Sequence, residues 1–231
     1  MGGLVGPGLG GLSSQPESSL GMTMGNPVRQ VALLGGSFDP VHLGHAALAQ
    51  AALQQLPIDA LWWLPAGQPW QKDRALTPVE HRVAMLDKTI GPDSRQRIET
   101  CELERPGPTY TIDTLRTLIA RHPGVVWHLL LGWDQFLNLP TWKQWTEVVA
   151  RVRLAVVPRA GAASALAPEL KALPFQRLLM APWEVSSTAI RADVALGRGI
   201  LDRVSAPVAR YIAEHGLYST RPPSQELNGH P

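Results

Sequence analysis

The sequence predicts an α/β fold in which a doubly wound, mainly parallel sheet carries helices on both faces and ends in a C-terminal helical region. Two observations support this prediction. Short apolar runs typical of buried strands alternate with longer segments of helical spacing, and such alternation implies βαβ units with right-handed crossovers. Most polar motifs also stand just after an expected strand or at an expected helix start, where ligands bind in open parallel sheets.

The first three elements form an expected strand–helix–strand unit. Residues 30–34 are a short apolar run that ends at two glycines, which suits a buried strand. Residues 43–56 are rich in Ala and Leu at helical spacing, so a helix is expected there. Residues 60–64 form a second apolar run, and Pro65 is expected to stop this strand because proline cannot donate to the ladder.

The next segment carries a helix-start signal. Thr77 is expected to cap a helix that reaches about Ile90, with Pro78 in the first turn and Glu80 three residues after the cap. The remaining elements continue the alternation, with expected strands over 97–99, 125–131, 152–157 and 177–180, a helix over 111–121 and a terminal helical region over 187–215.

Length and composition favour a single cytoplasmic domain. The 231 residues suffice for one large α/β core, which we expect over 27–220, between a disordered N-terminal extension over 1–26 and a flexible tail over 221–231. The net charge of +2 comes without a basic stripe, so no nucleic-acid partner is expected, and no apolar run approaches the ~18 residues of a membrane span. The single cysteine, Cys101, fits a reducing compartment, and neighbouring glutamates are expected to raise its pKa.

The most informative segment is GGSFDPVHLGH, residues 35–45, which follows the first strand and opens the first helix. Two glycines let the backbone approach a ligand closely, and the helix start presents unpaired N–H groups that suit a phosphate. His42 and His45 are three residues apart and share one helical face, while Gly44 between them leaves room for a bulky group. Paired imidazoles can donate to phosphate oxygens and stabilise charge that develops there. Their spacing alone is weak evidence for a metal site.

This segment resembles the GGxFDPxHxGH signature of the HxGH nucleotidyltransferase superfamily, and every fixed position is present. The resemblance implies a Rossmann-like fold and a nucleotide site in which His42 and His45 are catalytic. In the signature Asp39 has a structural role, so we do not expect it to act as a base or a metal ligand. The implied ATP-binding residues here are Gly35, Gly36, Ser37, Phe38 and Gly44.

A second motif, VSSTAIR over 185–191, stands at the start of the terminal helical region. Serine and threonine there are good caps, and their hydroxyl and N–H groups can hold phosphate oxygens. Arg191 would face the same way and clamp a phosphate bidentately. The motif resembles the ISSTxIR signature of the same superfamily, which implies that Ser187, Thr188 and Arg191 bind ATP and that Arg191 is catalytic.

Three further segments narrow the resemblance. ERPGPTYTIDTL over 104–115 resembles an SYTxDTL stretch, LGWDQFLNLPTW over 131–142 a GxDxxxxLPxW stretch, and YIAEHGLY over 211–218 a YIxxxGLY ending. Together they are similar to the bacterial nicotinate-nucleotide adenylyltransferases, over about 31–218. The resemblance implies adenylyl transfer from ATP to nicotinic acid mononucleotide in NAD biosynthesis, giving nicotinic acid adenine dinucleotide and pyrophosphate.

The substrate residues implied by these segments fit the chemistry of a pyridine nucleotide. An aromatic face suits the pyridine ring, and Trp142 is the expected platform, although it could instead be an ordinary core tryptophan. A helix start at Tyr110 and Thr111 offers donors to the nicotinate carboxylate. Asp134, just past an expected strand, is placed to bind ribose hydroxyls.

Attack by a phosphate on the α-phosphorus of ATP needs no general base, because a phosphate monoester with a pKa near ~6 is already ionised at neutral pH. The protein must align two anions and neutralise the leaving pyrophosphate, with Mg²⁺ bridging phosphates. We see no carboxylate cage for this Mg²⁺, which we expect the nucleotide to hold. Lys72 is a further candidate phosphate ligand, but the chain reads PWQK over 69–72 where the family commonly reads PPHK.

Two alternatives remain open at this stage. Another enzyme of the superfamily, such as a phosphopantetheine adenylyltransferase or a cytidylyltransferase, would share the first motif but should lack the SYTxDTL and LPxW stretches. A nucleotide-sensing protein with a retired active site is the alternative from another class, and the presence of His42, His45 and Arg191 argues against it. A homo-oligomer is possible, and the sequence does not specify it.

Overall fold

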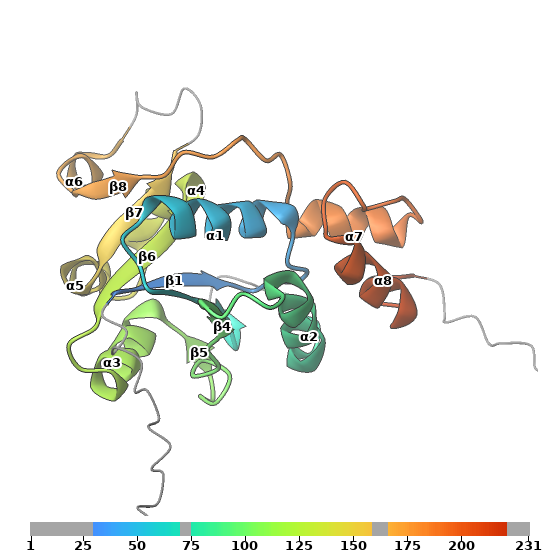
Figure 1. The fold of residues 1–231 in the computed structure, drawn as a ribbon, viewed down its shortest axis with the longest axis horizontal. Helices are drawn as coiled ribbons and strands as arrows, with labels where there is room; N and C mark the ends of the chain where they lie inside the picture. The colour runs from blue at the N-terminus through green and yellow to red at the C-terminus, as the bar shows by residue number, and fades with distance from the viewer. Residues whose placement is uncertain (1–29, 70–74, 159–165, 221–231) are drawn as a thin grey trace, which may run out of the picture.

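Six parallel strands form the central sheet in the order β4-β2-β1-β6-β7-β8 (Figure 1). The computed structural model describes residues 30–69, 75–158 and 166–220, so the expectations for 1–26, 221–231 and Lys72 lie outside the described residues. The chain builds outward from β1 to β4, then returns to the other side of β1 for β6, β7 and β8. This doubly wound order confirms the predicted fold class. The strands are β1 (Gln30–Gly36), β2 (Ala60–Pro65), β4 (Gln96–Ile98), β6 (Val126–Gly132), β7 (Arg153–Val157) and β8 (Phe175–Arg177).

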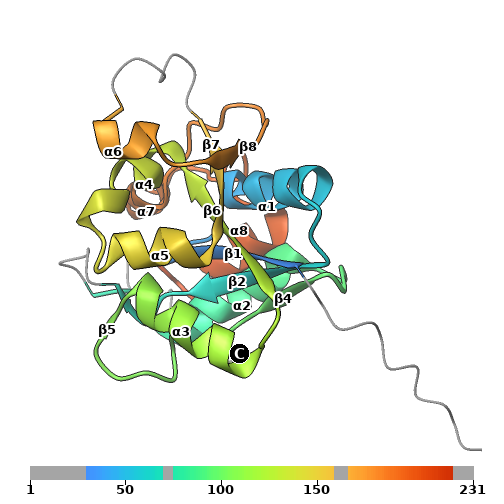
Figure 2. The same cartoon turned by 90° about the vertical axis from the view of Figure 1, so that its left-hand side faces the viewer.

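Helices cover both faces of the sheet, as the sequence predicts (Figures 1 and 2). Strand β1 shows the reason, because its side chains alternate between two cores: Ala32 and Leu34 join one, and Val31 and Leu33 join the other. The first core is covered by α1 (Leu43–Gln55), α2 (Val79–Ile90), α7 (Ser187–Ala195) and α8 (Ala206–Glu214). The second is covered by α3 (Thr111–Arg121), α4 (Trp133–Leu137), the 3₁₀ turn η1 (Leu139–Thr141), α5 (Trp145–Arg151) and α6 (Pro168–Lys171).

Several elements differ from the sequence prediction. The prediction that Thr77 caps α2 is wrong, because Pro78 occupies the cap position and makes no side-chain bond there. The backbone of Thr77 is hydrogen-bonded to the side chains of Asp39 and Arg82 instead. The last strand ends at Arg177 rather than spanning 177–180. The terminal helical region is two helices, because residues 196–205 leave the helical path between α7 and α8. The short elements β3 (Gln68–Pro69), β5 (Pro108–Thr109), α4, η1, α5 and α6 were not predicted.

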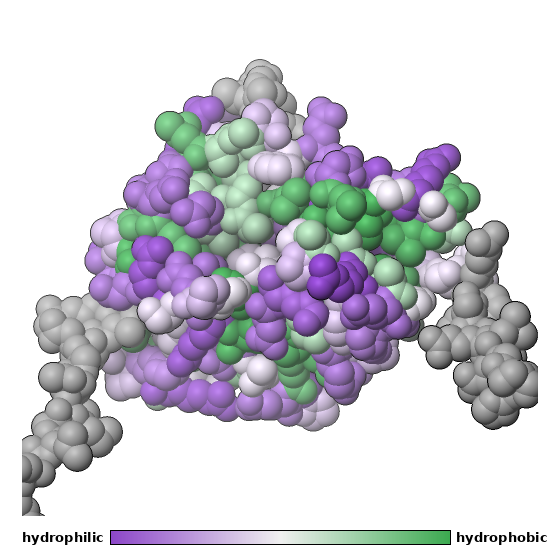
Figure 3. All heavy atoms as spheres, turned by 45° about the vertical axis from the view of Figure 1, so that its right-hand side comes forward, coloured by the Kyte–Doolittle hydropathy of each residue, from purple (hydrophilic) through white to green (hydrophobic). Residues whose placement is uncertain are grey.

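The surface alternates hydrophilic and hydrophobic areas, as Figure 3 shows for one side of the molecule. Within the described ranges, no helix has the length and apolar character that a membrane crossing requires. The large apolar side chains that remain exposed among the described residues are Leu137, Leu179, Trp183, Leu196 and Leu201.

Candidate functional site at the sheet switch point

The first motif lies where the strand order reverses. Strands β1 and β6 are parallel neighbours, with Gln30 paired to Val126 and Leu33 to Leu129. Their carboxyl ends therefore meet at one edge of the sheet, and each leads directly into a predicted motif: the 37–42 loop after β1 and the start of α4 after β6. Ligands bind at this edge in doubly wound sheets. The topology thus brings the predicted ATP residues of the first motif and Asp134 to the same edge of the sheet.

Phe38 anchors the loop after β1. Its side chain is fully buried, and its ring meets the rings of His45 and Trp63 edge-on, at centroid distances of 5.0 and 5.5 Å. The backbone of Phe38 has a φ of 48°, a region that non-glycine residues rarely adopt. The predicted role of Phe38 in ATP binding is therefore restricted to its backbone, while its ring supports His45.

The two imidazoles are stacked on each other. Their centroids lie 3.6 Å apart with 23° between the ring planes. The backbone N–H of His42 donates to Nδ1 of His45 at 3.2 Å, so a neutral His45 carries its proton on Nε2. Nδ1 of His42 is buried and has no hydrogen-bond partner within the described part of the chain. Burial lowers the pKa of His42 to about 4, so this ring is neutral at pH 7.

The start of α1 is less open than the sequence suggests. The N–H of Leu43 donates to the Arg203 carbonyl at 2.8 Å, and those of His45 and Ala46 donate to the His42 carbonyl. The expectation of unpaired N–H groups is therefore wrong for Leu43 and His45, whereas the bond of Ala46 is the ordinary first bond of an α-helix. The expected room at Gly44 is also taken, because a Cβ there would stand 3.0 Å from Val185 Cγ1. Gly44 instead lets α1 pack closely against the segment before α7.

The second motif bonds directly to the loop that follows β1. The Ser187 hydroxyl donates to the Pro40 carbonyl at 2.9 Å, and Arg191 Nη1 donates to the Asp39 carbonyl at 2.7 Å. Arg191 Nη2 also donates to Thr188 Oγ1 at 3.2 Å. The N–H groups of Ser187 and Thr188 occupy the first two positions of α7, where no intrahelical acceptor exists. The start of α7 thus has N–H groups without an intrahelical acceptor, which is the feature expected at the start of α1.

Asp39 is a buried structural carboxylate, in agreement with the sequence analysis. It is fully buried, and its two oxygens accept from the Tyr218 hydroxyl at 2.7 Å and from the Thr77 N–H at 3.4 Å. Arg82, also buried, donates from Nη1 to the carbonyls of Ser37 and Ala66, both at 2.9 Å, and from Nε to Thr77. Sequence reasoning missed Arg82, because one arginine in an amphipathic helix gives no signal of a buried role.

The predicted substrate residues lie at the start of α3, at the start of α4 and at the end of η1. Tyr110 is the cap residue of α3 and Thr111 its first residue. Lys143 Nζ lies 4.4 Å from the Tyr110 ring centroid and 3.0 Å from Asp113 Oδ2. Trp142 is half-buried against the second core, and its buried Nε1 has no partner among the described residues. Asp134 is exposed at the start of α4.

Comparison with known proteins assigns the chain to a family. The cytidylyltransferase-like family matches residues 33–193. A probable nicotinate-nucleotide adenylyltransferase of Methylibium petroleiphilum is 44% identical and covers 84% of this chain and 94% of its own length. Its counterpart in Bordetella petrii is 43% identical over 83% of this chain and its whole length. The chain belongs to the nicotinate-nucleotide adenylyltransferase family.

Solved structures at lower identity share the fold. The nicotinic acid mononucleotide adenylyltransferase of Plasmodium falciparum, complexed with NaAD, superposes with a TM-score of 0.67 at 22% identity, covering 82% of this chain and 97% of its own. A putative nicotinate-nucleotide adenylyltransferase of Vibrio parahaemolyticus gives a TM-score of 0.63 at 17% identity, covering 84% and 97%. At these identities the likeness supports the doubly wound fold alone.

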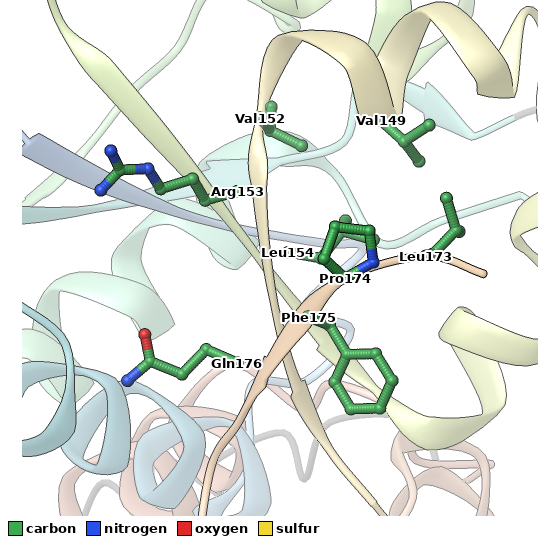
Figure 4. A pocket seen from close by; sticks show the side chains of 8 residues that line it. All are labelled: Val149, Val152, Arg153, Leu154, Leu173, Pro174, Phe175 and Gln176. Carbon is green, nitrogen blue, oxygen red and sulfur yellow. The ribbon is translucent and has the colours of Figure 1, made fainter. Parts of the chain in front are cut away.

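Two further features lie apart from the family motifs. Burial and then the charges of Glu99 and Glu102 raise the pKa of Cys101 to about 12, as the sequence suggests, so its buried thiol is unreactive. A pocket of about 380 Å³ opens at the amino ends of β7 and β8, the edge of the sheet opposite the motifs (Figure 4). It contains none of the predicted site residues; its lining is Val149, Val152, Arg153, Leu154, Leu173, Pro174, Phe175 and Gln176.

Proposed function

We propose that this chain transfers the adenylyl group of ATP to nicotinic acid mononucleotide, forming nicotinic acid adenine dinucleotide and pyrophosphate. The observation that carries the proposal is the junction of the two phosphate motifs, in which Ser187 and Arg191 bond to the loop that leads to His42 and His45. The junction lies at the switch point of the sheet. The chain belongs to a family of nucleotidyltransferases, and this membership supports nicotinic acid mononucleotide as the acceptor.

The reaction joins two phosphates in one displacement. An oxygen of the mononucleotide phosphate attacks the α-phosphorus of ATP, the bond to the bridging oxygen of the β-phosphate breaks, and that oxygen leaves with pyrophosphate. A neutral His42, the Nε2 proton of His45 and the Arg191 guanidinium are the proposed donors to the phosphate oxygens that gain charge. The N–H groups of Ser187 and Thr188 at the start of α7 add two further donors.

Mg²⁺ belongs to this proposal as a companion of ATP. Over the described residues, no group of three His, Cys, Asp or Glu side chains converges where it could hold a cation. Mg²⁺ commonly keeps several waters and binds through substrate phosphates, which suits a site of this composition. The cation would neutralise the charge of the triphosphate, and the residues named above would orient it.

The pyridine mononucleotide is proposed to bind beside the start of α3. Tyr110 and Thr111 offer a helix start to the nicotinate carboxylate, and the half-buried Trp142 ring offers a face to the pyridine. Asp134 is proposed to bind ribose hydroxyls, because it is exposed at the carboxyl end of β6. We also propose a cytoplasmic location, in keeping with the free, buried thiol of Cys101.

The test is a substrate panel with purified protein. Pyrophosphate release is measured with ATP and, separately, nicotinic acid mononucleotide, nicotinamide mononucleotide and phosphopantetheine. We expect the highest kcat/KM with nicotinic acid mononucleotide. Turnover of phosphopantetheine in place of the pyridine nucleotides would assign the chain to another branch of the superfamily. Binding of ATP without any turnover would instead support a retired, nucleotide-sensing protein.

A further inference from the structure

Tyr218, near the C-terminal end of the described residues, is hydrogen-bonded to Asp39 in the first motif. We propose that Tyr218 is a positioning residue of the ATP site, which fixes the loop between β1 and α1 through its hydrogen bond to the buried Asp39. The inference rests on the proposed function for its kinetic test. It assigns a role to a residue that lies outside both phosphate motifs.

Two observations at Tyr218 indicate a specific role. Its hydroxyl donates to Asp39 Oδ1 at 2.7 Å, across 179 residues of sequence, and Asp39 is fully buried. Its backbone has a φ of 63°, a region sparsely populated by non-glycine residues, which persists where the surrounding structure fixes it. Burial and the bond to Asp39 raise the pKa of Tyr218 above its usual range, so the hydroxyl remains a donor at every physiological pH.

Tyr218 and the second motif are hydrogen-bonded to the same loop, which connects β1 to α1. The Asp39 side chain accepts from Tyr218, while the Asp39 carbonyl accepts from Arg191 at 2.7 Å. The next carbonyl, of Pro40, accepts from Ser187 at 2.9 Å. One buried residue therefore links the C-terminal ending to the proposed phosphate-binding arginine. Loss of the Tyr218 hydroxyl would leave a buried carboxylate oxygen without this donor, and the loop would shift to compensate.

A shift of this loop would act on ATP more than on the mononucleotide. The loop precedes His42 directly and carries the acceptors of Arg191 and Ser187, all of which are assigned to ATP. The residues proposed to bind the pyridine ring, Tyr110 and Trp142, pack against the second core, on the other face of the sheet. Since a misplacement of about 1 Å can cost about 10²-fold in rate, a small loop movement suffices for a measurable defect.

The chain supplies a matched control in its other C-terminal tyrosine. The Tyr211 hydroxyl bonds to His81 Nδ1 at 3.0 Å and ties α8 to α2 rather than to either motif. Tyr218→Phe and Tyr211→Phe each delete one half-buried hydroxyl and keep the ring. A purely structural role for Tyr218 would make the two variants alike.

The experiment measures kcat, the KM for each substrate, the Kd for ATP and the thermal midpoint of both variants. We expect both midpoints to fall by a few degrees. In Tyr218→Phe, the Kd and KM for ATP should rise roughly tenfold, because ATP would have to restore the position of the displaced loop as it binds, with the KM for the mononucleotide unchanged. Tyr211→Phe should keep wild-type kinetics.

Equal ATP affinities in the two variants would overturn the inference, as would a Tyr218→Phe protein with wild-type kinetics. A wild-type protein without turnover would contradict the proposed function instead. In that case the Kd for ATP, measured by calorimetry, still decides the role of Tyr218: a weaker Kd in Tyr218→Phe alone supports it, and an unchanged Kd refutes it.

Discussion

The two halves of the proposed site are held together in different ways. The ATP half joins segments 147, 152 and 179 residues apart through hydrogen bonds to the buried or half-buried loop after β1. The pyridine half is held by ion pairs on accessible side chains, such as Lys143 with Asp113, which are 44% and 28% exposed. Buried networks are stiff and costly to break, whereas exposed ion pairs are weak and screened by salt.

This difference in rigidity matches the proposed role of each half. Stabilising charge in a phosphoryl transition state requires donors fixed before the reaction begins. Choosing between two pyridine mononucleotides that differ by one charge requires a local electrostatic bias, which an adaptable surface can supply. The variants below separate the rigid half from the adaptable one.

The largest effect is expected from Asp39→Ala in the ATP half. Burial lowers the pKa of Arg82, and the charge of Asp39 opposes that shift, so the substitution leaves a buried guanidinium without its neighbouring carboxylate. We expect a loss of about 3–5 kcal/mol in the free energy of unfolding, measured by urea denaturation. The matched control, Asp113→Ala in the pyridine half, should lose about 1 kcal/mol or less. Equal losses would show that the two halves are equally rigid.

His45→Ala tests the rigid half by rate rather than by stability. The Nε2 proton of His45 is one of the proposed donors to the phosphates. Removal of the ring should lower kcat by about 10²–10³, as for one lost transition-state donor. Pyrophosphate release provides the measurement. His81→Ala removes an imidazole at the α2–α8 contact and should leave kcat near the wild-type value. A defect below about fivefold in His45→Ala would remove His45 from the proposed donors.

The stability of the protein should depend on pH through His42. Its pKa is about 4 in the folded state and near 6.5 when exposed, so between these values the unfolded chain binds the extra proton. The His42 contribution is therefore complete above pH 6.5 and is lost as the pH falls towards 4. We expect about 2 kcal/mol, because the partly exposed ring is screened by water. His42→Asn, which places a neutral residue favoured at helix N-caps in the same position, should lack this component when urea unfolding is compared at pH 6.5 and 4.5.

The smallest effect is expected from Lys143→Met in the adaptable half. The ammonium group beside Tyr110 should favour nicotinate over nicotinamide by about 1 kcal/mol, the scale of an exposed charge at short range. The ratio of kcat/KM for the two mononucleotides should therefore fall about fivefold at low salt. At 0.5 M salt, wild type and variant should converge. A ratio unaffected by the substitution would leave the backbone donors at Thr111 as the source of any preference.

The sequence was informative where signals are local. Apolar runs located strands β1, β2, β6 and β7, and the fixed spacing of His42, Gly44 and His45 marked the proposed phosphate site. Helices α4, α5 and α6 are 5, 7 and 4 residues long, too short to show a helical period. Such short elements are recognisable only from their packing.

The remaining failures come from contacts between distant segments. Thr77 carries a good capping signal, but Asp39 and Arg82 bind its backbone and Pro78 takes the cap position. Of the N–H groups expected to be unpaired at the start of α1, that of Leu43 donates to the carbonyl of Arg203, about 160 residues away. No local pattern encodes these partners, and the same is true of the bond between Tyr218 and Asp39.

The most direct test is a crystal structure with a non-hydrolysable ATP analogue and nicotinic acid mononucleotide bound together. The triphosphate should lie against the rings of His42 and His45 and against the α7 start with Arg191, while the pyridine lies beside Tyr110 and Trp142. A triphosphate bound at any other edge of the sheet, with both imidazoles out of its reach, would contradict the proposed site and the mechanism built on it.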